Sequence, residues 1–364
     1  MRIALVGARS HPARHGGIER AVEELARELV ARGHEVTVLV ADVAGEPGTG
    51  GPAVRRVASL PGKYSKALSQ AFASVLHVPA RRFDVVHVHG VGPGIVIPLL
   101  KARRLRVVLT VHALDFERDK WPGPAKRVFR GLSRAGVRGA DRVVVVAEHL
   151  REAVRDLYGV DAHVVHNGVT TPAVDPALPA VTELGLAPGS YALFVGRLVP
   201  EKRVEVLLTA HAGLQPEVPL LVVGSGQGSY AGEYEQSLRD VSRGDVRFLG
   251  QQSHDVVCQL VQGAAVLVNP SALEGLPLTV LEARALGTPV VLSDIAPHRE
   301  LAGPSTALFP VDDVPALTAA LHEVLRDAAA RQASARGEQA DVTAAFSWGA
   351  VTERTLELYR EAAR

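Results

Sequence analysis

The chain has 364 residues, 47% of them hydrophobic, and a net charge of +1, which is enough length and apolar mass for two domains of ordinary size. Val, Leu and Ala dominate the apolar residues and aromatics make up only 4%, a balance that favours alternating strands and helices over a β-sandwich. The single cysteine, Cys258, excludes an internal disulfide and indicates a reducing cytoplasm, and no apolar run reaches the ~18 residues that span a bilayer.

The chain begins with a strand, a loop, a helix and a second strand in succession. Residues 3–6 form an apolar strand that is too short and too early for a signal peptide. Apolar residues at helical spacing predict a helix over 18–29, and residues 35–40 read as the next strand. We therefore expect a parallel sheet with right-handed crossovers. The loop ends in Gly16-Gly17 and lacks the tight turn of dinucleotide enzymes, so it allows a ligand to approach the helix start.

The same alternation of strands and helices continues to the end of the chain. In the first half we expect a loop or weak strand over 42–62, helices over 63–82, 94–102, 120–138 and 148–158, and strands over 84–89, 106–112 and 141–147. In the second half we expect strands over 191–195, 219–223, 246–249, 264–268, 289–292 and 306–309, a helix over 204–212 and a helical tail over 346–364.

Residues 171–190 hold four prolines and make the best linker in the chain. The fold predicted is α/β, with two Rossmann-like domains facing each other across a ligand cleft. The N-terminal domain covers residues 1–170. The C-terminal domain covers residues 191–345.

Residues 269–291 form a loop and a helix between two apolar strands. Pro277 suits the first helical turn and Gly287 the C-terminal stop. The free N–H groups and the positive dipole end of such a helix make an anion site. Glu274 and Glu282 frame that site. Carboxylates beside an anion site suggest a ligand that carries both phosphate and hydroxyls, which describes a nucleotide sugar.

The segment 196–203 follows the first strand of the second half. It places Arg197 and Lys202 five residues apart, where they can clamp a diphosphate from one side. Arginine offers a planar fork of donors and lysine a point charge. A solvated basic turn is the alternative for this segment taken alone.

Taken together, Glu274, Glu282, Arg197 and Lys202 resemble the signature of the retaining glycosyltransferases of family 4, which have the two-domain GT-B architecture. The resemblance extends over nearly the whole chain. It also includes Gly16-Gly17-Ile18-Glu19-Arg20, His112 in its loop, Asn167-Gly168-Val169, and Phe346-Ser347-Trp348 before the tail helix that crosses back to the N-terminal domain.

The resemblance implies a role for each matching residue. Glu282 would hydrogen-bond the ribose of the donor, and Glu274 would bind hydroxyls of the transferred sugar. Arg197 and Lys202 would neutralise the leaving diphosphate, and fixed cations are effective there because negative charge develops on it. The residues implied for catalysis are His112, Arg197, Lys202 and Glu274, and those implied for donor binding are Gly16, Gly17, Gly196, Arg197, Lys202, Glu274, Gly275, Leu276, Leu278 and Glu282.

The other candidate residues lie in the first half. His87 and His89 alternate onto one face of a strand, and we expect His89 to contact the acceptor. Asp115 either contacts the acceptor, fixes the His112 loop or caps a helix. No Asp-x-Asp motif or dense His/Asp/Glu cluster occurs, so we expect no metal. We also expect no cofactor apart from the donor substrate, a UDP, GDP or dTDP sugar.

The two halves differ in charge. Residues 1–170 hold 26 basic and 16 acidic residues, a net charge of +10, and residues 171–364 have a net charge of −9. The basic helices expected over 63–82 and 120–138 either pack on their own sheet or dock on anionic lipid at the inner face of the membrane. Nucleic acid is not an expected partner, because the basic residues lack interleaved aromatics.

The function expected is retaining transfer of a sugar from a nucleotide-diphosphate sugar to a hydroxyl acceptor. The acceptor is a carbohydrate, a lipid-linked molecule or a small molecule, and the products belong to bacterial surface polysaccharide, glycolipid or glycosylated metabolite synthesis. A sugar-nucleotide epimerase on the same scaffold is the alternative. Such an enzyme would need further acid and base residues in the cleft. A non-catalytic binding module is a third hypothesis.

Overall fold

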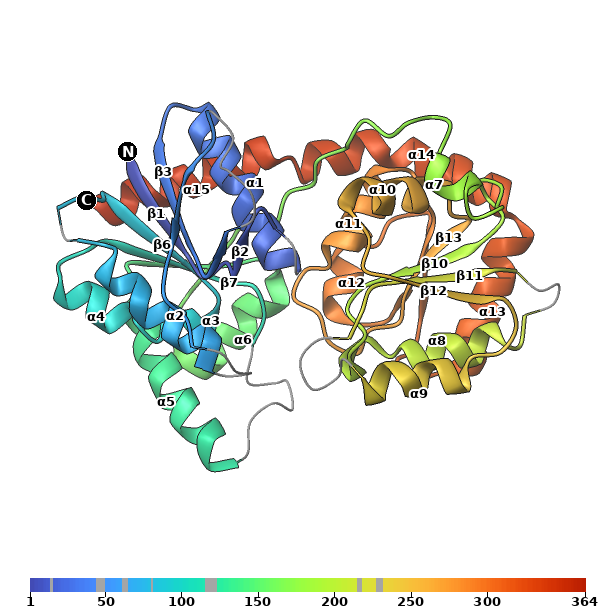
Figure 1. The fold of residues 1–364 in the computed structure, drawn as a ribbon, viewed down its shortest axis with the longest axis horizontal. Coiled ribbons are helices and arrows are strands. Elements are labelled where there is room, and N and C mark those ends of the chain that lie inside the picture. The colour runs from blue at the N-terminus through green and yellow to red at the C-terminus, as the bar shows by residue number, and fades with distance from the viewer. Residues whose placement is uncertain are drawn as a thin grey trace. The chain divides into compact units, whose positions relative to one another are not determined.

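A computed structural model describes residues 1–13, 16–43, 50–60, 65–79, 81–114, 123–214, 218–226 and 232–364. The chain folds into two compact units, each built around a parallel β-sheet (Figure 1). Unit 1 contains residues 1–168 and 348–364, and unit 2 contains residues 169–347. The predicted α/β fold is confirmed in both units.

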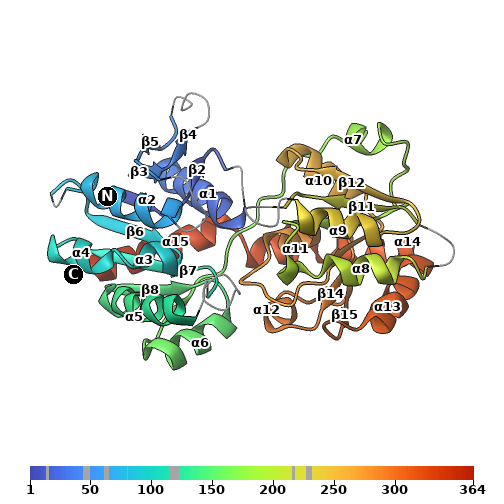
Figure 2. The same ribbon diagram turned by 60° about the horizontal axis from the view of Figure 1, so that its bottom comes forward.

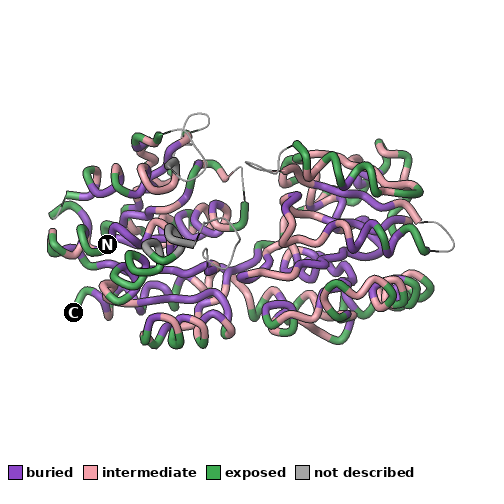
Figure 3. The backbone as a smooth tube through the Cα atoms, turned by 90° about the horizontal axis from the view of Figure 1, so that it is seen from below, coloured by how far each residue is buried: buried purple, intermediate pink, exposed green. Residues whose placement is uncertain are grey.

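The sheet of unit 1 has seven strands in the order β5-β3-β1-β6-β7-β8-β9. Its strands are β1 (Arg2–Val6), β3 (Glu35–Val40), β5 (Ala53–Arg56), β6 (Val85–His89), β7 (Val107–Val111), β8 (Arg142–Val145) and β9 (His163–Val164). A separate parallel pair joins β2 (Ser10–His11) to β4 (Asp42–Val43). The inner strands β3, β1, β6, β7 and β8 are mostly buried, whereas the outer strands β5 and β9 are not; buried residues are purple in Figure 3.

Helices cover both faces of this sheet (Figure 1). On one face α1 (Gly17–Ala31) packs beside α15 (Trp348–Ala363), so the predicted return of the tail helix to the first unit is confirmed. The other face carries α2 (Ser65–Leu76), α3 (Val91–Gly94), α4 (Ile97–Ala102) and α5 (Gly123–Gly139), with α6 (Glu148–Tyr158) beside α5 (Figure 2).

The sheet of unit 2 has the order β12-β11-β10-β13-β14-β15. Its strands are β10 (Ala192–Val195), β11 (Leu220–Val223), β12 (Val246–Gly250), β13 (Val266–Asn269), β14 (Val290–Ser293) and β15 (Thr306–Phe309). One face carries α8 (Val204–His211), α9 (Glu233–Val241) and α13 (Val314–Arg326). The other carries α7 (Pro179–Thr182), α10 (His254–Gly263), α11 (Leu278–Ala285) and α14 (Ala328–Ala345). Two short helices, η1 (Pro200–Lys202) and α12 (Ala296–Glu300), follow β10 and β14.

In both sheets the strand order reverses direction at the centre. The reversal falls between β1 and β6 in unit 1, and between β10 and β13 in unit 2. In open parallel sheets, ligands bind beyond the carboxyl ends of the strands at such a switch point. The loops that leave these four strands are therefore where a binding site is expected.

Three predicted elements differ from the structure. The helix expected over 94–102 is two helices, because Pro98 has no N–H to continue a ladder and instead lies in the first turn of α4. The helix expected over 63–82 is observed only as α2 and ends at Leu76. The expected linker 171–190 contains α7, where the Ala180 N–H donates to Gln259 Oε1 at 2.9 Å. No helix in the described part of the chain is long and apolar enough to cross a bilayer.

Gly136 and Gly131 of α5 give a matched pair for testing the helix packing of unit 1. A Cβ at position 136 would lie 2.2 Å from the carbonyl oxygen of Gly94, whereas a Cβ at position 131 would meet no atom within 4 Å. Gly136→Ala should therefore destabilise the protein by about 1–3 kcal/mol through overpacking. Gly131→Ala should stabilise it by about 0.5–1 kcal/mol, because alanine is the better helix former. Urea unfolding followed by circular dichroism measures both, and shifts of the same sign would contradict this packing.

Candidate active site

The switch point of unit 2 brings together the charged residues singled out in the sequence. Arg197 and Lys202 follow β10, and Glu274 follows β13. The two loops are joined where the Ala272 N–H donates to the Glu201 carbonyl at 2.9 Å. Lys202 Nζ donates to Glu274 Oε1, and the side chains of this ion pair are only 15% and 11% exposed.

The two oxygens of the Glu274 carboxylate have different surroundings. Besides Lys202, Oε1 accepts from Ser271 Oγ at 2.8 Å and lies 3.3 Å from Asn269 Nδ2. No donor among the described residues reaches Oε2. Glu274 is thus anchored through one oxygen only. Sequence reasoning missed Asn269 and Ser271, although both stand within five residues of Glu274.

A second layer of hydrogen bonds lies behind Ser271. Ser293 Oγ, at the end of β14, donates to the Ser271 carbonyl at 2.5 Å. His298 of α12 donates from Nδ1 to the Ser293 carbonyl at 2.7 Å. Both side chains are fully buried. Nothing in the sequence signals this layer, because it joins residues of two separate βα segments.

Electrostatics keep Glu274 ionised. Burial is the largest single effect and by itself would raise the pKa of the carboxyl, and the positive charge of Lys202 is the largest of the effects that oppose it. The proximity of His298 and the hydrogen bonds from Lys202 and Ser271 act in the same direction. The net effect lowers the pKa of Glu274 from 4.5 to about 2, so the carboxylate is an acceptor and not an acid at neutral pH.

The start of α11 adds hydrogen-bond donors to this cluster. Pro277 is its N-cap residue and so lies one position before the first helical turn, in which the sequence placed it. Within the described part of the chain, no acceptor meets the backbone N–H groups of Gly275, Leu276 and Leu278. Glu282 lies one turn further along α11 and is partly exposed.

Two more predicted residues lie beside β10. The Gly196 N–H donates to the Val223 carbonyl at 3.0 Å, which places Gly196 at the carboxyl end of the strand. A Cβ at Gly224 would lie 1.8 Å from the Gly196 carbonyl oxygen, so the backbones touch here. The Arg197 side chain is 27% exposed, and its Nη2 lies 3.9 Å from Glu201 Oε1.

In unit 1 the predicted residues fall into two places. Gly16 is the N-cap of α1, with a φ of +153° that favours glycine, and Gly17 is the first helical residue; both are exposed. His89 ends β6 and His112 follows β7, and His89 Nδ1 lies 3.1 Å from His112 Nε2. Both histidines are buried. Asp115 lies outside the described residues.

Across the described part of the chain, no three His, Cys, Asp or Glu side chains are arranged to hold a metal ion. Among the described residues, unit 2 thus holds an anchored carboxylate with one open oxygen, two cations and three amides that meet no acceptor. Taken by itself, unit 1 holds the exposed Gly16-Gly17 start of α1 and a pair of contacting histidines.

Comparison with known proteins follows the same division of the chain. Residues 15–172 match the family described as Glycosyltransferase Family 4, and residues 189–327 match Glycosyl transferases group 1. A D-inositol 3-phosphate glycosyltransferase of Kineococcus radiotolerans is 31% identical over 99% of this chain and 95% of its own.

Two solved structures share the fold. A sucrose-phosphate synthase from Thermosynechococcus elongatus superposes with a TM-score of 0.87 at 24% identity, covering 99% of this chain and 98% of the other. Anabaena Alr3699/HepE in complex with UDP-glucose gives a TM-score of 0.81 at 19% identity, covering 98% of each chain. At these identities the likeness concerns the fold alone.

The depressed pKa of Glu274 predicts how stability depends on pH. Its pKa of about 2 in the folded protein lies below its ordinary value of 4.5, so the unfolded chain takes up the proton first as the pH falls. The stabilisation is therefore complete above pH 4.5 and is lost between about pH 4.5 and 2. It amounts to about 3 kcal/mol.

Glu274→Gln should be less stable than wild type at pH 7, and the gap should close towards pH 3. Urea unfolding at pH 7, 5, 4 and 3 measures this difference, and the shared titration of other carboxyls cancels in the comparison. Stability curves that stay parallel over this range would contradict the assignment.

Proposed function

This chain belongs to glycosyltransferase family 4 and has the GT-B fold of two Rossmann-like domains, and on that premise we propose that it moves a sugar from a nucleotide-diphosphate sugar to a hydroxyl acceptor. The observation that carries the proposal is the open Oε2 of Glu274 beside Lys202, together with the amides at the start of α11 that meet no acceptor among the described residues. A carboxylate oxygen can accept hydrogen bonds from sugar hydroxyls. A lysine side chain together with backbone N–H groups at a helix start can bind a diphosphate.

Each residue of unit 2 has a part in the proposal. Glu282 binds the ribose hydroxyls of the donor, and Glu274 binds hydroxyls of the transferred sugar. Arg197 and Lys202 neutralise the diphosphate as it leaves, together with the amides of Gly275, Leu276 and Leu278. Fixed donors and cations at a leaving group are effective because they need no reorganisation during the reaction.

Unit 1 contributes the remaining parts. Gly16 and Gly17, at the start of α1, are donor-binding residues, and His112 contacts the transferred sugar. Acceptor binding is assigned to this unit, with Asp115 in direct contact. His89 is only 3% exposed, so its effect on the substrates passes through His112.

We assign retention of anomeric configuration and independence of metal ions. Retention follows the family resemblance, and metal independence follows from the lysine and arginine that replace a cation at the diphosphate. The UDP-glucose bound by the Anabaena protein supports a nucleotide-sugar donor, and the name of the Kineococcus relative supports a small polyol phosphate as one class of acceptor. The epimerase alternative has no support, because the matching families and this relative are glycosyltransferases.

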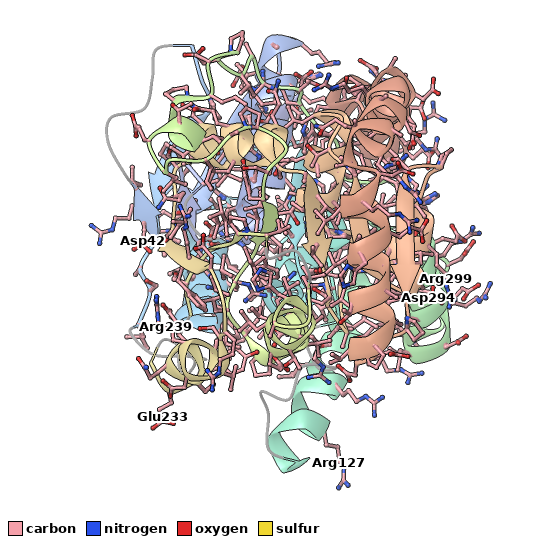
Figure 4. All side chains as sticks on the ribbon, turned by 90° about the vertical axis from the view of Figure 1, so that its right-hand side faces the viewer. Asp42, Arg127, Glu233, Arg239, Asp294 and Arg299 are labelled. Carbon is pink, nitrogen blue, oxygen red and sulfur yellow. The ribbon has the colours of Figure 1, made fainter. Side chains whose placement is uncertain are left out.

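We also place the enzyme in the cytoplasm, with peripheral contact to anionic membrane lipid through α5. Figure 4 shows Arg127 projecting outward from this helix. Arg134 is exposed on the same helix, and so is Leu132, with 49% of its surface accessible. A helix that exposes arginines and an apolar side chain together suits a lipid headgroup layer.

Incubation with labelled UDP-, GDP- and dTDP-sugars and candidate acceptors tests the function. We expect transfer, or slow donor hydrolysis without acceptor, and the same rate in EDTA. The product should keep the donor's anomeric configuration by proton NMR. Isomerised donor would instead identify an epimerase, and binding without turnover would identify a binding module.

Substitutions of Glu282 and Lys202 should change different kinetic constants. Glu282→Ala should raise the donor KM by about 10-fold or more, because it removes hydrogen bonds to an ionised acceptor. Lys202→Ala should lower kcat by about 100-fold, because it removes charge from the leaving phosphate. Steady-state kinetics with the best donor separates the two effects.

Glu323→Ala is the matched control, since that carboxylate is 58% exposed on α13. It should leave both constants within about twofold, as expected for a surface substitution. If Glu282→Ala and Lys202→Ala also behaved like this control, the donor site would have to lie elsewhere.

Co-sedimentation with lipid vesicles tests the contact through α5. The protein should bind vesicles containing phosphatidylglycerol and not neutral phosphatidylcholine vesicles, and binding should fall with added salt. Arg127→Glu combined with Arg134→Glu should reduce binding several-fold, whereas Arg239→Glu on α9 should not. Equal binding to both vesicle types would rule the contact out.

A further inference from the structure

Three histidines meet at the carboxyl ends of β6 and β7. His87 and His89 stand two residues apart in β6 and therefore share a face, with ring centroids 4.0 Å apart. The ring of His112 stacks on His89 at 5.4 Å with an interplanar angle of 25°. All three side chains are buried.

The three rings form a column, and its first member, His87, has a hydrogen-bond partner at both ring nitrogens. His87 Nδ1 lies 2.6 Å from the Tyr359 hydroxyl, and His87 Nε2 lies 2.7 Å from Thr110 Oγ1. Tyr359 belongs to α15 and is fully buried. His89 therefore packs against a ring that cannot turn, which fixes its own orientation.

Burial keeps the column uncharged. It lowers the pKa of His87 to about 3 and that of His112 to about 4, and it also lowers the pKa of His89. A neutral imidazole carries one N–H, so of the two nitrogens that join His89 to His112 one donates and the other accepts.

The surroundings of His89 decide which nitrogen donates. Its Nε2 is buried and meets no hydrogen-bond partner within the described residues. If His112 donated, the proton of His89 would sit on this nitrogen as an orphaned buried N–H, which folded proteins rarely tolerate. His89 therefore donates from Nδ1 to His112 Nε2 at 3.1 Å, and His112 keeps its proton on Nδ1.

We propose that His89 is a positioning residue that holds His112 as the Nδ1–H tautomer, so that His112 offers the transferred sugar an N–H donor. Because the lone pair of Nε2 is already engaged, His112 is not available as a general base. The inference rests on the proposed function, in which His112 contacts the sugar. It adds which atom of His112 does so and in which protonation state.

Substitutions at position 89 test the proposal. The side-chain amide of asparagine places an N–H close to the position of Nδ1, whereas that of glutamine reaches the position of Nε2. His89→Asn should keep kcat within about threefold of wild type. His89→Gln and His89→Leu should lower kcat by about 10- to 100-fold with little change in donor KM, because a misplaced group costs turnover and not ground-state binding. Equal kcat values in all three variants would overturn the proposal.

The tautomer can also be measured directly in the wild-type protein. Nitrogen-15 NMR of histidine-labelled enzyme, with the His112 signals identified from their loss in His112→Gln, should show a protonated Nδ1 and a bare Nε2. A protonated Nε2 would overturn the proposal even if the position-89 variants failed to fold. This measurement needs no substrate, so it stands apart from the donor screen: an enzyme without transferase activity would refute the proposed function but not the tautomer.

Discussion

The ion pair between Lys202 and Glu274 is the interaction on which the site in unit 2 depends. It joins the loops that leave β10 and β13, the two strands between which the sheet reverses its order. Three donors approach one oxygen of the carboxylate, which stays ionised despite its burial. The same arrangement that stabilises the charge leaves the second oxygen without a donor among the described residues, so the stability of the loop and the hydroxyl binding proposed for Glu274 have one cause.

The sheet of unit 1 also reverses its strand order at the centre, but the side chains there are uncharged. At its switch point the backbones of β1 and β6 nearly touch, since a Cβ at Gly7 would lie 2.2 Å from the His89 carbonyl oxygen. The side chains gathered there are neutral, buried histidines and not charged pairs.

The last helix completes the first unit. In the sequence Tyr359 is separated from β1 by almost the whole chain. It nevertheless packs in the same core, and its hydroxyl is hydrogen-bonded to Nδ1 of His87. The histidine column therefore depends on a segment that a shortened chain would lack. The tail helix serves the chemistry proposed for His112 as well as the packing of the sheet.

Periodicity and short motifs were enough to predict much of this protein. Apolar spacing identified the strands and the longer helices, because the face that a residue occupies depends on its position within its own element. The candidate residues Glu274, Lys202 and those at the start of α11 could also be predicted, because each lies in a short segment that is recognisable by itself. What only the tertiary structure decided is which strands are neighbours: Lys202 and Glu274 stand 72 residues apart, and His89 and His112 stand 23 apart. The number of residues between two positions does not tell which strands are neighbours. The open oxygen, the layer behind Ser271 and the contacts from which the tautomer of His112 is inferred therefore became visible only in the folded chain.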